Sequence, residues 1–136
     1  MNNKVHEWPV RVYIEDTDAG GIVFYANYLK YMERARTEWL REEGFNKPAM
    51  PEEGRLLIVA AINVNYVRSA ALDDELMIKT RILKAARSYW EIEQLVERDQ
   101  ALLCKGIVKL ACVDSKSLRP KPIPQALSAI ASRASP

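Results

Sequence analysis

Alternation of apolar and polar side chains is the feature that most constrains the fold of this chain. It recurs in five segments, in which apolar side chains largely occupy every second position. Clean alternation of this kind predicts strands of an antiparallel sheet with one covered face. The first segment is separated from the other four by a long interruption. The five predicted strands are Val5–Ile14, Ile58–Tyr66, Leu76–Ile82, Trp90–Val96 and Cys104–Cys112.

The interruption contains a segment with helical periodicity. It runs from about Ala26 to Glu43, with Asn27 as its predicted N-terminal cap and Gly44 as its predicted stop. Its apolar side chains cover about half of the circumference of a helix, and so broad a face favours a surface that curves around it. The sequence therefore predicts an α+β fold in which one long central helix is wrapped by a curled five-stranded antiparallel sheet. The predicted core side chains of the helix are Tyr28, Leu29, Tyr31, Met32, Ala35, Trp39 and Leu40.

Length and composition narrow the class of protein. A chain of 136 residues without a linker or repeat predicts a single domain, residues 1–136. No apolar run is long enough to span a bilayer, and the N-terminal residues lack an apolar signal segment. The spacing of Cys104 and Cys112 suits one face of one strand, so we expect two free core thiols in a reducing cytoplasm. With His6 as the only histidine, the chain offers too few soft ligands for a metal site.

An acidic loop with two glycines lies between the first predicted strand and the helix. It reads Glu15-Asp16-Thr17-Asp18-Ala19-Gly20-Gly21, and its glycines permit a sharp turn and close backbone approach. The first turn of a helix offers unpaired N–H groups and a positive dipole end. These stabilise negative charge that develops on a carbonyl oxygen, such as that of a thioester. Asp18, a few residues upstream, can attack the carbon of that carbonyl or take a proton from water.

The residues around this loop carry a family resemblance. The informative positions are Thr17-Asp18, Gly21-Ile22-Val23, Asn27-Tyr28 and Tyr31-Met32-Glu33-Arg34-Ala35-Arg36. The stretch from Arg11 to Arg36 resembles the signature of the 4-hydroxybenzoyl-CoA thioesterase family, which has the hotdog fold. It is especially similar to the branch of bacterial acyl-CoA thioesterases linked to the Tol–Pal system. The similarity continues more loosely through Tyr66–Ala70, Asp74–Leu76 and Arg119-Pro120.

The resemblance implies an activity and an assembly. A member of this family hydrolyses an acyl-CoA to a free carboxylate and CoA without a cofactor, and we expect a short-chain or aromatic acyl group. The family builds its active sites at dimer interfaces, and the long strand edges that a curled sheet leaves open also favour pairing between subunits. We therefore expect a homodimer, or a homotetramer made of two dimers.

The resemblance also assigns roles to two residues. Asp18 aligns with the catalytic aspartate, which acts as nucleophile or general base. Tyr25 aligns with the residue whose backbone N–H, at the start of the central helix, polarises the thioester carbonyl. Many Tol–Pal-linked relatives carry His at the position of Tyr25, where this chain resembles the hydroxybenzoyl enzyme. Because the donor is a main-chain group, Tyr is compatible with the same function.

Each of these assignments has an alternative. Asp18 can merely cap the helix or hold its own turn. Glu33 is a rival catalytic carboxylate on the helix, although Arg36 lies one turn further on and suits a structural ion pair with it. Asp16 is expected to be a solvated loop charge. His6 is expected at the surface or in the sheet.

The charges suggest a place for the CoA phosphates. The net charge is only +2, but Lys and Arg dominate from Arg55 onward. They are scattered rather than gathered in a nucleic-acid-binding stripe, and they suit a small polyanionic ligand. Arg87 and Ser88, in a predicted turn, are the candidate phosphate-binding residues.

Two rival functions stay open. A hotdog dehydratase pairs a His with an acidic residue, and the position of His6 before the core of the first strand argues against it. A non-enzymatic domain that binds an acyl thioester or another ligand is the second.

Overall fold

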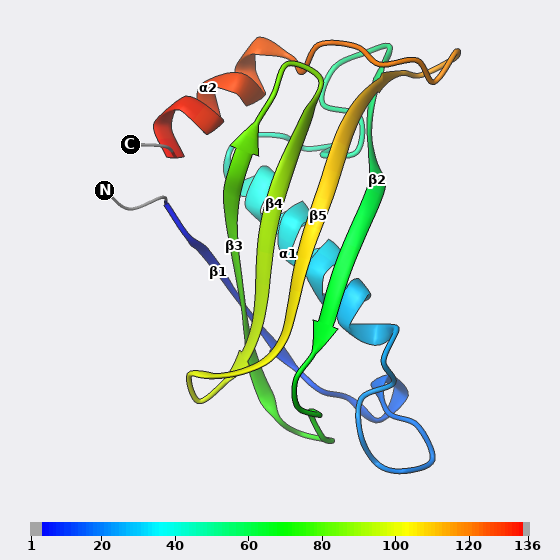
Figure 1. Cartoon of the computed structure of the whole chain (residues 1–136), viewed down its shortest axis with the longest axis vertical. Coiled ribbons are helices and arrows are strands. Elements are labelled where there is room, and N and C mark those ends of the chain that lie inside the picture. The colour runs from blue at the N-terminus through cyan, green and yellow to red at the C-terminus, as the bar shows by residue number, and fades with distance from the viewer. Residues whose placement is uncertain (1–3, 135–136) are drawn as a thin grey trace.

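The computed structural model describes residues 4–134, which contain five strands and two α-helices. The strands form one antiparallel sheet in the order β1-β3-β4-β5-β2, and α1 lies against one face of it (Figure 1). The predicted α+β arrangement of five antiparallel strands and a helix is confirmed, whereas a strong curl of the sheet stays a prediction. The elements are β1 (His6–Arg11), α1 (Asn27–Glu42), β2 (Arg55–Tyr66), β3 (Glu75–Ala85), β4 (Tyr89–Arg98), β5 (Ala101–Asp114) and α2 (Gln125–Ala134).

The first strand is shorter than predicted. β1 ends at Arg11, and Ile14–Asp16 forms a single turn of 3-10 helix instead of continuing the strand to Ile14. The carboxylate of Asp16 accepts a hydrogen bond from the N–H of Tyr13 at 2.9 Å. Such a local bond between side chain and backbone competes with the ladder of a sheet and turns the chain away from it.

The ends of α1 correct one prediction and confirm another. The helix begins at Asn27 itself, and Ala26 occupies the cap position without a side-chain hydrogen bond, so the predicted cap at Asn27 is wrong. At the other end, Gly44 has a φ of +104°, a conformation that side chains disfavour and that commonly ends a helix. The predicted stop at Gly44 is therefore confirmed.

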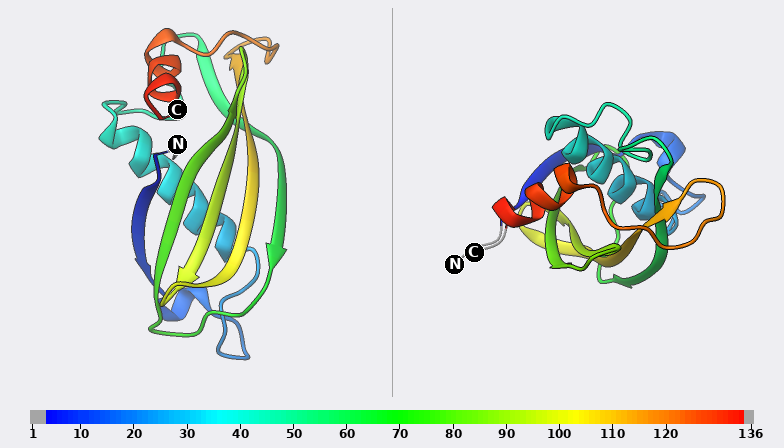
Figure 2. Two further views of the ribbon diagram at one scale, coloured as in Figure 1. Left: turned by 60° about the vertical axis from the view of Figure 1, so that its left-hand side comes forward. Right: turned by 90° about the horizontal axis from the view of Figure 1, so that it is seen from above.

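The buried side chains form two clusters along α1. One packs around its N-terminal half and includes Tyr31, Ile78 and Cys104. The other packs around its C-terminal half, includes Trp39 and Cys112, and is covered by α2 (Figure 2). Both cysteines are buried in β5 and free, as predicted, and burial raises the pKa of Cys104 to about 11. Within residues 4–134, no helix is long and apolar enough to cross a membrane.

A buried polar contact joins the middle of α1 to the sheet. The amide of Gln94, fully buried in β4, donates to the carbonyl oxygen of Met32 and to the hydroxyl of Thr80, each at 2.9 Å. Its oxygen accepts a hydrogen bond from Arg36 at 2.9 Å. Arg36 is thus bound to Gln94, and the predicted ion pair with Glu33 is wrong. Burial lowers the pKa of Arg36, and the charge of Glu33 opposes that shift.

Candidate functional site

Asp16 anchors the loop that carries Asp18. It is 6% exposed, and its carboxylate accepts hydrogen bonds from the N–H of Tyr13 at 2.9 Å and from the side-chain amide of Asn27 at 2.7 Å. Its main-chain oxygen accepts the N–H of Phe24 at 2.9 Å. Burial raises the pKa of Tyr31, and the nearby carboxylate of Asp16 raises it further. The prediction that Asp16 is a solvated charge is wrong, because this side chain fastens the loop to the first residue of α1.

Asp18 sits in a tight turn at the tip of this loop. Its N–H donates to the carbonyl of Ile22 at 2.9 Å, and its carbonyl accepts the N–H of Gly21 at 3.0 Å. One carboxylate oxygen accepts the N–H of Gly20 at 2.8 Å. Gly21 has a φ of +79°, and a Cβ on Gly20 would lie 3.2 Å from the Asp18 carboxylate. The backbone requirement predicted for these glycines is confirmed at Gly21, whereas Gly20 meets a side chain rather than a backbone limit.

The carboxylate of Asp18 uses one of its two oxygens in the hydrogen bonds of its turn. Within residues 4–134, its second oxygen has no hydrogen-bond partner, and the side chain is exposed. Asp18 does hold its own turn, as one alternative proposed, but α1 has no side-chain cap. The carboxylate can therefore accept a proton or reach a reacting carbon without breaking the fold of the loop.

Asp18 and Tyr25 line the same cavity at the N-terminal end of α1. The cavity has a volume of about 340 Å³, and the rest of its wall includes Tyr28 and the segment Tyr66–Ser69, where β2 ends. Tyr25 lies two positions before Asn27, the first residue of α1. Its N–H has no hydrogen-bond partner among residues 4–134. An unpaired N–H at the positive end of a helix favours a partially negative oxygen at that place.

A cluster of tyrosines surrounds this N–H. The hydroxyl of Tyr66 donates to the carbonyl oxygen of Tyr25 at 2.9 Å. The ring of Tyr66 meets those of Tyr25 and Tyr28 edge-on, at centroid distances of 6.2 and 5.6 Å. The hydroxyl of Tyr28 accepts the N–H of Ala70 at 2.9 Å. Partial burial raises the pKa of Tyr66, and burial also raises that of Tyr28.

Sequence reasoning assigned Tyr66 to a strand and missed its contact with the site. Its place in the alternating pattern of β2 predicts only which face of the sheet it lies on, and not which residue it contacts. The available signal was its place at the start of Tyr66–Ala70, a segment that carries part of the family resemblance.

Glu33 lies in a different cavity. It shares a space of about 320 Å³ with Thr37, Leu40 and the β2 segment 57–59. Within one chain, the structure therefore separates this rival carboxylate from the cavity of Asp18 and Tyr25.

Arg87 and Ser88 lie far from Asp18 in the same chain. They form the turn between β3 and β4, which is at the opposite end of the long axis from the Asp18 loop (Figure 1). Their carbonyl oxygens accept the N–H groups of Ile123 and Cys112, each at 2.8 Å. The side chain of Arg87 is exposed and has no ion-pair partner in the described part of the chain. One chain alone does not bring these two residues to the site.

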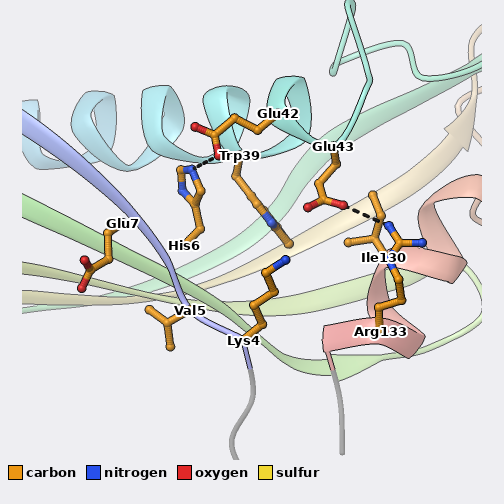
Figure 3. A pocket seen from close by; sticks show the side chains of 9 residues that line it. All are labelled: Lys4, Val5, His6, Glu7, Trp39, Glu42, Glu43, Ile130 and Arg133. Carbon is orange, nitrogen blue, oxygen red and sulfur yellow. Dashed lines mark hydrogen bonds and ion pairs between the residues drawn. The ribbon is translucent and has the colours of Figure 1, made fainter.

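A further cavity of about 340 Å³ lies at the C-terminal end of α1 (Figure 3). His6, now placed in β1, pairs with Glu42 at 3.0 Å, and Arg133 of α2 pairs with Glu43 at 3.0 Å. Trp39 forms part of the wall. These two ion pairs join β1, α1 and α2, while the buried Nδ1 of His6 has no partner among the described residues. Among the described residues, no group of three His, Cys, Asp or Glu side chains is placed to hold a metal ion.

One antiparallel sheet packed on a helix, together with the relatives of this chain, defines a hotdog-fold thioester hydrolase. The chain belongs to the Thioesterase-like superfamily, whose family model matches residues 12–130. It is 42% identical over 123 residues to the acyl-CoA thioesterase YbgC of Haemophilus influenzae, covering 90% of each protein. It is 39% identical over 130 residues to the acyl-CoA thioester hydrolase YbgC of Escherichia coli O6:H1, covering 95% of this chain and 97% of that protein. The predicted enzyme class, a thioester hydrolase, is confirmed by these relatives.

Solved structures agree with the fold. A probable thioesterase from Bartonella henselae is 32% identical, with a TM-score of 0.80 over 89% of this chain and 100% of that one. The gentisyl-coenzyme A thioesterase BH1999 is 25% identical, with a TM-score of 0.82 over 94% of this chain and 99% of that one.

Proposed function

We propose that this chain is an acyl-CoA thioesterase that hydrolyses the CoA thioester of a short-chain or aromatic acyl group. The observation that carries the proposal is the cavity shared by Asp18 and the unpaired N–H of Tyr25. The YbgC relatives are named as enzymes of this reaction. A cavity of about 340 Å³ with tyrosine walls suits a compact or aromatic acyl group better than a long chain.

The two groups divide the chemistry between them. The thioester oxygen accepts a hydrogen bond from the N–H of Tyr25, and the end of α1 stabilises the negative charge that develops there. Asp18 then either attacks the carbonyl carbon or takes a proton from an attacking water. In the first route the C–S bond breaks, CoA leaves as a thiolate that gains a proton, and water hydrolyses the acyl-aspartate. In the second route water adds directly and CoA leaves in the same way. Both give one carboxylate and one free CoA per water consumed.

Within the superfamily, we place the chain beside the 4-hydroxybenzoyl-CoA thioesterase family and its Tol–Pal-linked branch. The support is the match of Arg11–Arg36 to that signature, together with the YbgC relatives. We also propose a cytoplasmic, cofactor-free enzyme. Two free buried cysteines suit a reducing compartment, and the reaction needs only protein groups and water.

The assembly that we propose is a homodimer joined through β2, which can pair again to a homotetramer. The sheet has two edges, β1 and β2. β1 has only 6 residues and contains Pro9, which makes it a poor edge for pairing. β2 has 12 residues without proline, and Ile58, Val59 and Ile62 are exposed along it. An exposed apolar edge of this length favours symmetric pairing with a second copy.

Such pairing would complete the site. Two antiparallel β2 strands related by a two-fold axis place the Tyr66 end of one beside the Arg55 end of the other. The Asp18 cavity of one subunit then adjoins the partner's cavity at 57–59, which contains Glu33. The two subunits also run in opposite directions, so Arg87 and Ser88 of the partner subunit lie at the Asp18 end. We propose that they bind the CoA phosphates there.

The test is hydrolysis of a panel of CoA thioesters with short-chain, long-chain and aromatic acyl groups, followed with a thiol-reactive reporter. We expect release of CoA from short-chain or aromatic substrates, at rates that vary with the acyl group. The buried cysteines, with pKa values raised by burial, should add little background. Absence of CoA release from every substrate, by a protein that is folded and dimeric, would support the non-enzymatic alternative.

A further inference from the structure

The main chain at Tyr25 is held by a contact from outside the helix. The N–H of Phe24 donates to the Asp16 carbonyl at 2.9 Å, and the N–H of Asn27 donates to the Phe24 carbonyl at 2.8 Å. Between these two bonds, the carbonyl of Tyr25 accepts no helical N–H, because the N–H of Leu29 bonds to Ala26 instead, at 3.1 Å. Among residues 4–134, the partner found for the Tyr25 carbonyl is the hydroxyl of Tyr66, at 2.9 Å.

The geometry of this bond links the sheet to the candidate oxyanion donor. Tyr66 is the last residue of β2 and is 41 positions from Tyr25 in sequence. Its ring packs edge-on against Tyr25 and Tyr28, and the hydroxyl of Tyr28 is itself fixed by the N–H of Ala70. The packing of the neighbouring rings therefore orients the Tyr66 side chain independently of its hydrogen bond to the Tyr25 carbonyl. A side chain whose orientation is already restricted loses less conformational freedom when it holds a second group in place.

The consequence concerns the direction of the Tyr25 N–H. Its orientation depends on the backbone dihedral angles around Phe24 and Tyr25. The Asp16 bond restrains the peptide that precedes Phe24, and the Tyr66 bond restrains the peptide that follows Tyr25. The peptide that carries the Tyr25 N–H is itself held by the bond from the Asn27 N–H to the Phe24 carbonyl, at 2.8 Å. Without the Tyr66 bond, the peptide that follows Tyr25 loses its restraint, and the turn can relax on the side that faces the cavity. An oxyanion donor is effective when it already points at the place where charge develops, so a small rotation reduces the rate of the chemical step.

We propose that Tyr66 is a positioning residue that aims the N–H of Tyr25 at the substrate carbonyl through its hydrogen bond to the Tyr25 carbonyl. The proposal rests on the thioesterase function proposed above, but it adds a residue that acts through another one. Tyr66 also lines the cavity, so its ring is expected to contact substrate, whereas its hydroxyl serves the backbone. The hydroxyl and the ring can therefore be separated by substitution.

The experiment compares Tyr66→Phe with Tyr89→Phe. The first removes the hydroxyl and keeps the ring. The second removes a hydroxyl from a strand tyrosine beside Lys84 and Lys109, which does not line the Asp18 cavity of its own chain. For Tyr66→Phe we expect kcat to fall by about tenfold, the size of one lost hydrogen bond, while KM changes by less than about twofold. Tyr89→Phe should leave kcat at the wild-type value. The Tyr25 amide resonance in a ¹H–¹⁵N spectrum should shift in the first variant and not in the second.

The readouts distinguish positioning from other roles. The proposal is overturned if Tyr66→Phe has the wild-type kcat, or if kcat falls only together with the native mass or thermal stability. It is also overturned if the Tyr25 resonance stays in place. The amide resonance does not depend on turnover, so the positioning contact is tested even if no thioester is hydrolysed. If no thioester is hydrolysed, the proposed thioesterase function is wrong, and the amide resonance still decides whether Tyr66 holds the Tyr25 backbone.

Discussion

Two cavities of similar volume lie at opposite ends of α1 and use their polar groups differently. At the C-terminal end, His6 pairs with Glu42 and Arg133 pairs with Glu43, so β1, α1 and α2 are joined by matched charges. At the N-terminal end, Asp18 bonds only to its own turn, and the N–H of Tyr25 has no partner in the described chain. Ion pairs between elements dominate the C-terminal end, whereas the N-terminal end leaves a carboxylate oxygen and a main-chain N–H available for a ligand.

The same contrast separates two aspartates of one loop. Asp16 is buried and accepts hydrogen bonds from Tyr13 and Asn27, whereas Asp18, two positions later, is exposed with one free oxygen. Polar groups that are already satisfied hold an element in place, and unsatisfied ones beside a cavity are available for chemistry. For these two aspartates, the paired or unpaired state of the carboxylate distinguishes the structural role from the candidate site role. Three substitutions of polar residues test this contrast, and a fourth, at the edge of β2, tests whether a second subunit completes the site.

The largest effect is expected at Asp18. Asp18→Asn retains an oxygen that can accept the N–H of Gly20, so the turn and the fold should persist. It removes the carboxylate that we propose as nucleophile or general base, so kcat for a CoA thioester should fall by about 100-fold or more. Steady-state kinetics measure the loss of kcat, and a thermal melt followed by circular dichroism checks that the fold persists. Near wild-type rates in Asp18→Asn, combined with lost activity in Glu33→Gln, would move the catalytic assignment to the helix.

The next effect tests whether the site needs a second subunit. Ile62→Arg places a charge on the exposed apolar edge of β2 and should convert the proposed dimer to monomer, with activity lower by about tenfold or more. Val5→Arg, beside the other edge, is the matched control and should keep the native mass and rate. Light scattering and a dilution series of activity provide the measurement. A fully active monomer would refute the shared site and leave the role of Asp18 intact.

A smaller effect is expected at Arg87, whose charge is unpaired. Arg87→Ala should raise KM for CoA thioesters by about tenfold, the size of one charge-assisted hydrogen bond, without changing KM for thioesters that lack the nucleotide. Arg133→Ala removes an arginine that Glu43 already pairs, and should leave both KM values unchanged. Equal effects of Arg87→Ala on both kinds of substrate would exclude phosphate contact as its role.

The smallest effect is expected where charges are already matched. Glu42→Gln weakens the contact with His6, and because the carboxylate of Glu42 is largely exposed, the free energy of unfolding should fall by less than about 1 kcal/mol. Activity should stay at the wild-type level. Urea unfolding and steady-state kinetics provide the check. A marked loss of turnover in Glu42→Gln would show that the paired cavity also serves the reaction, and the contrast between the two ends would not hold.

Much of this protein could be predicted from local patterns. Alternation located the five strands because neighbouring side chains on a strand point to opposite faces. The errors occur where a distant or local partner overrides the pattern. The strand predicted to Ile14 stops at Arg11 because Asp16 binds the backbone of Tyr13. Arg36 donates to Gln94 rather than pairing with Glu33, because Gln94, from another element, provides a buried acceptor.

The sequence by itself determined the order of elements, the turn of Gly20 and Gly21, and Asp18 as the candidate carboxylate, since each depends on residues that are close along the chain. Only the tertiary structure decided which polar groups are paired. Tyr66 reaches Tyr25 across 41 positions, Asp16 is buried against α1, and Arg87 lies at the end opposite Asp18. The physical reason is that a hydrogen bond depends on distances between atoms in space, and packing of the helix on the sheet sets those distances.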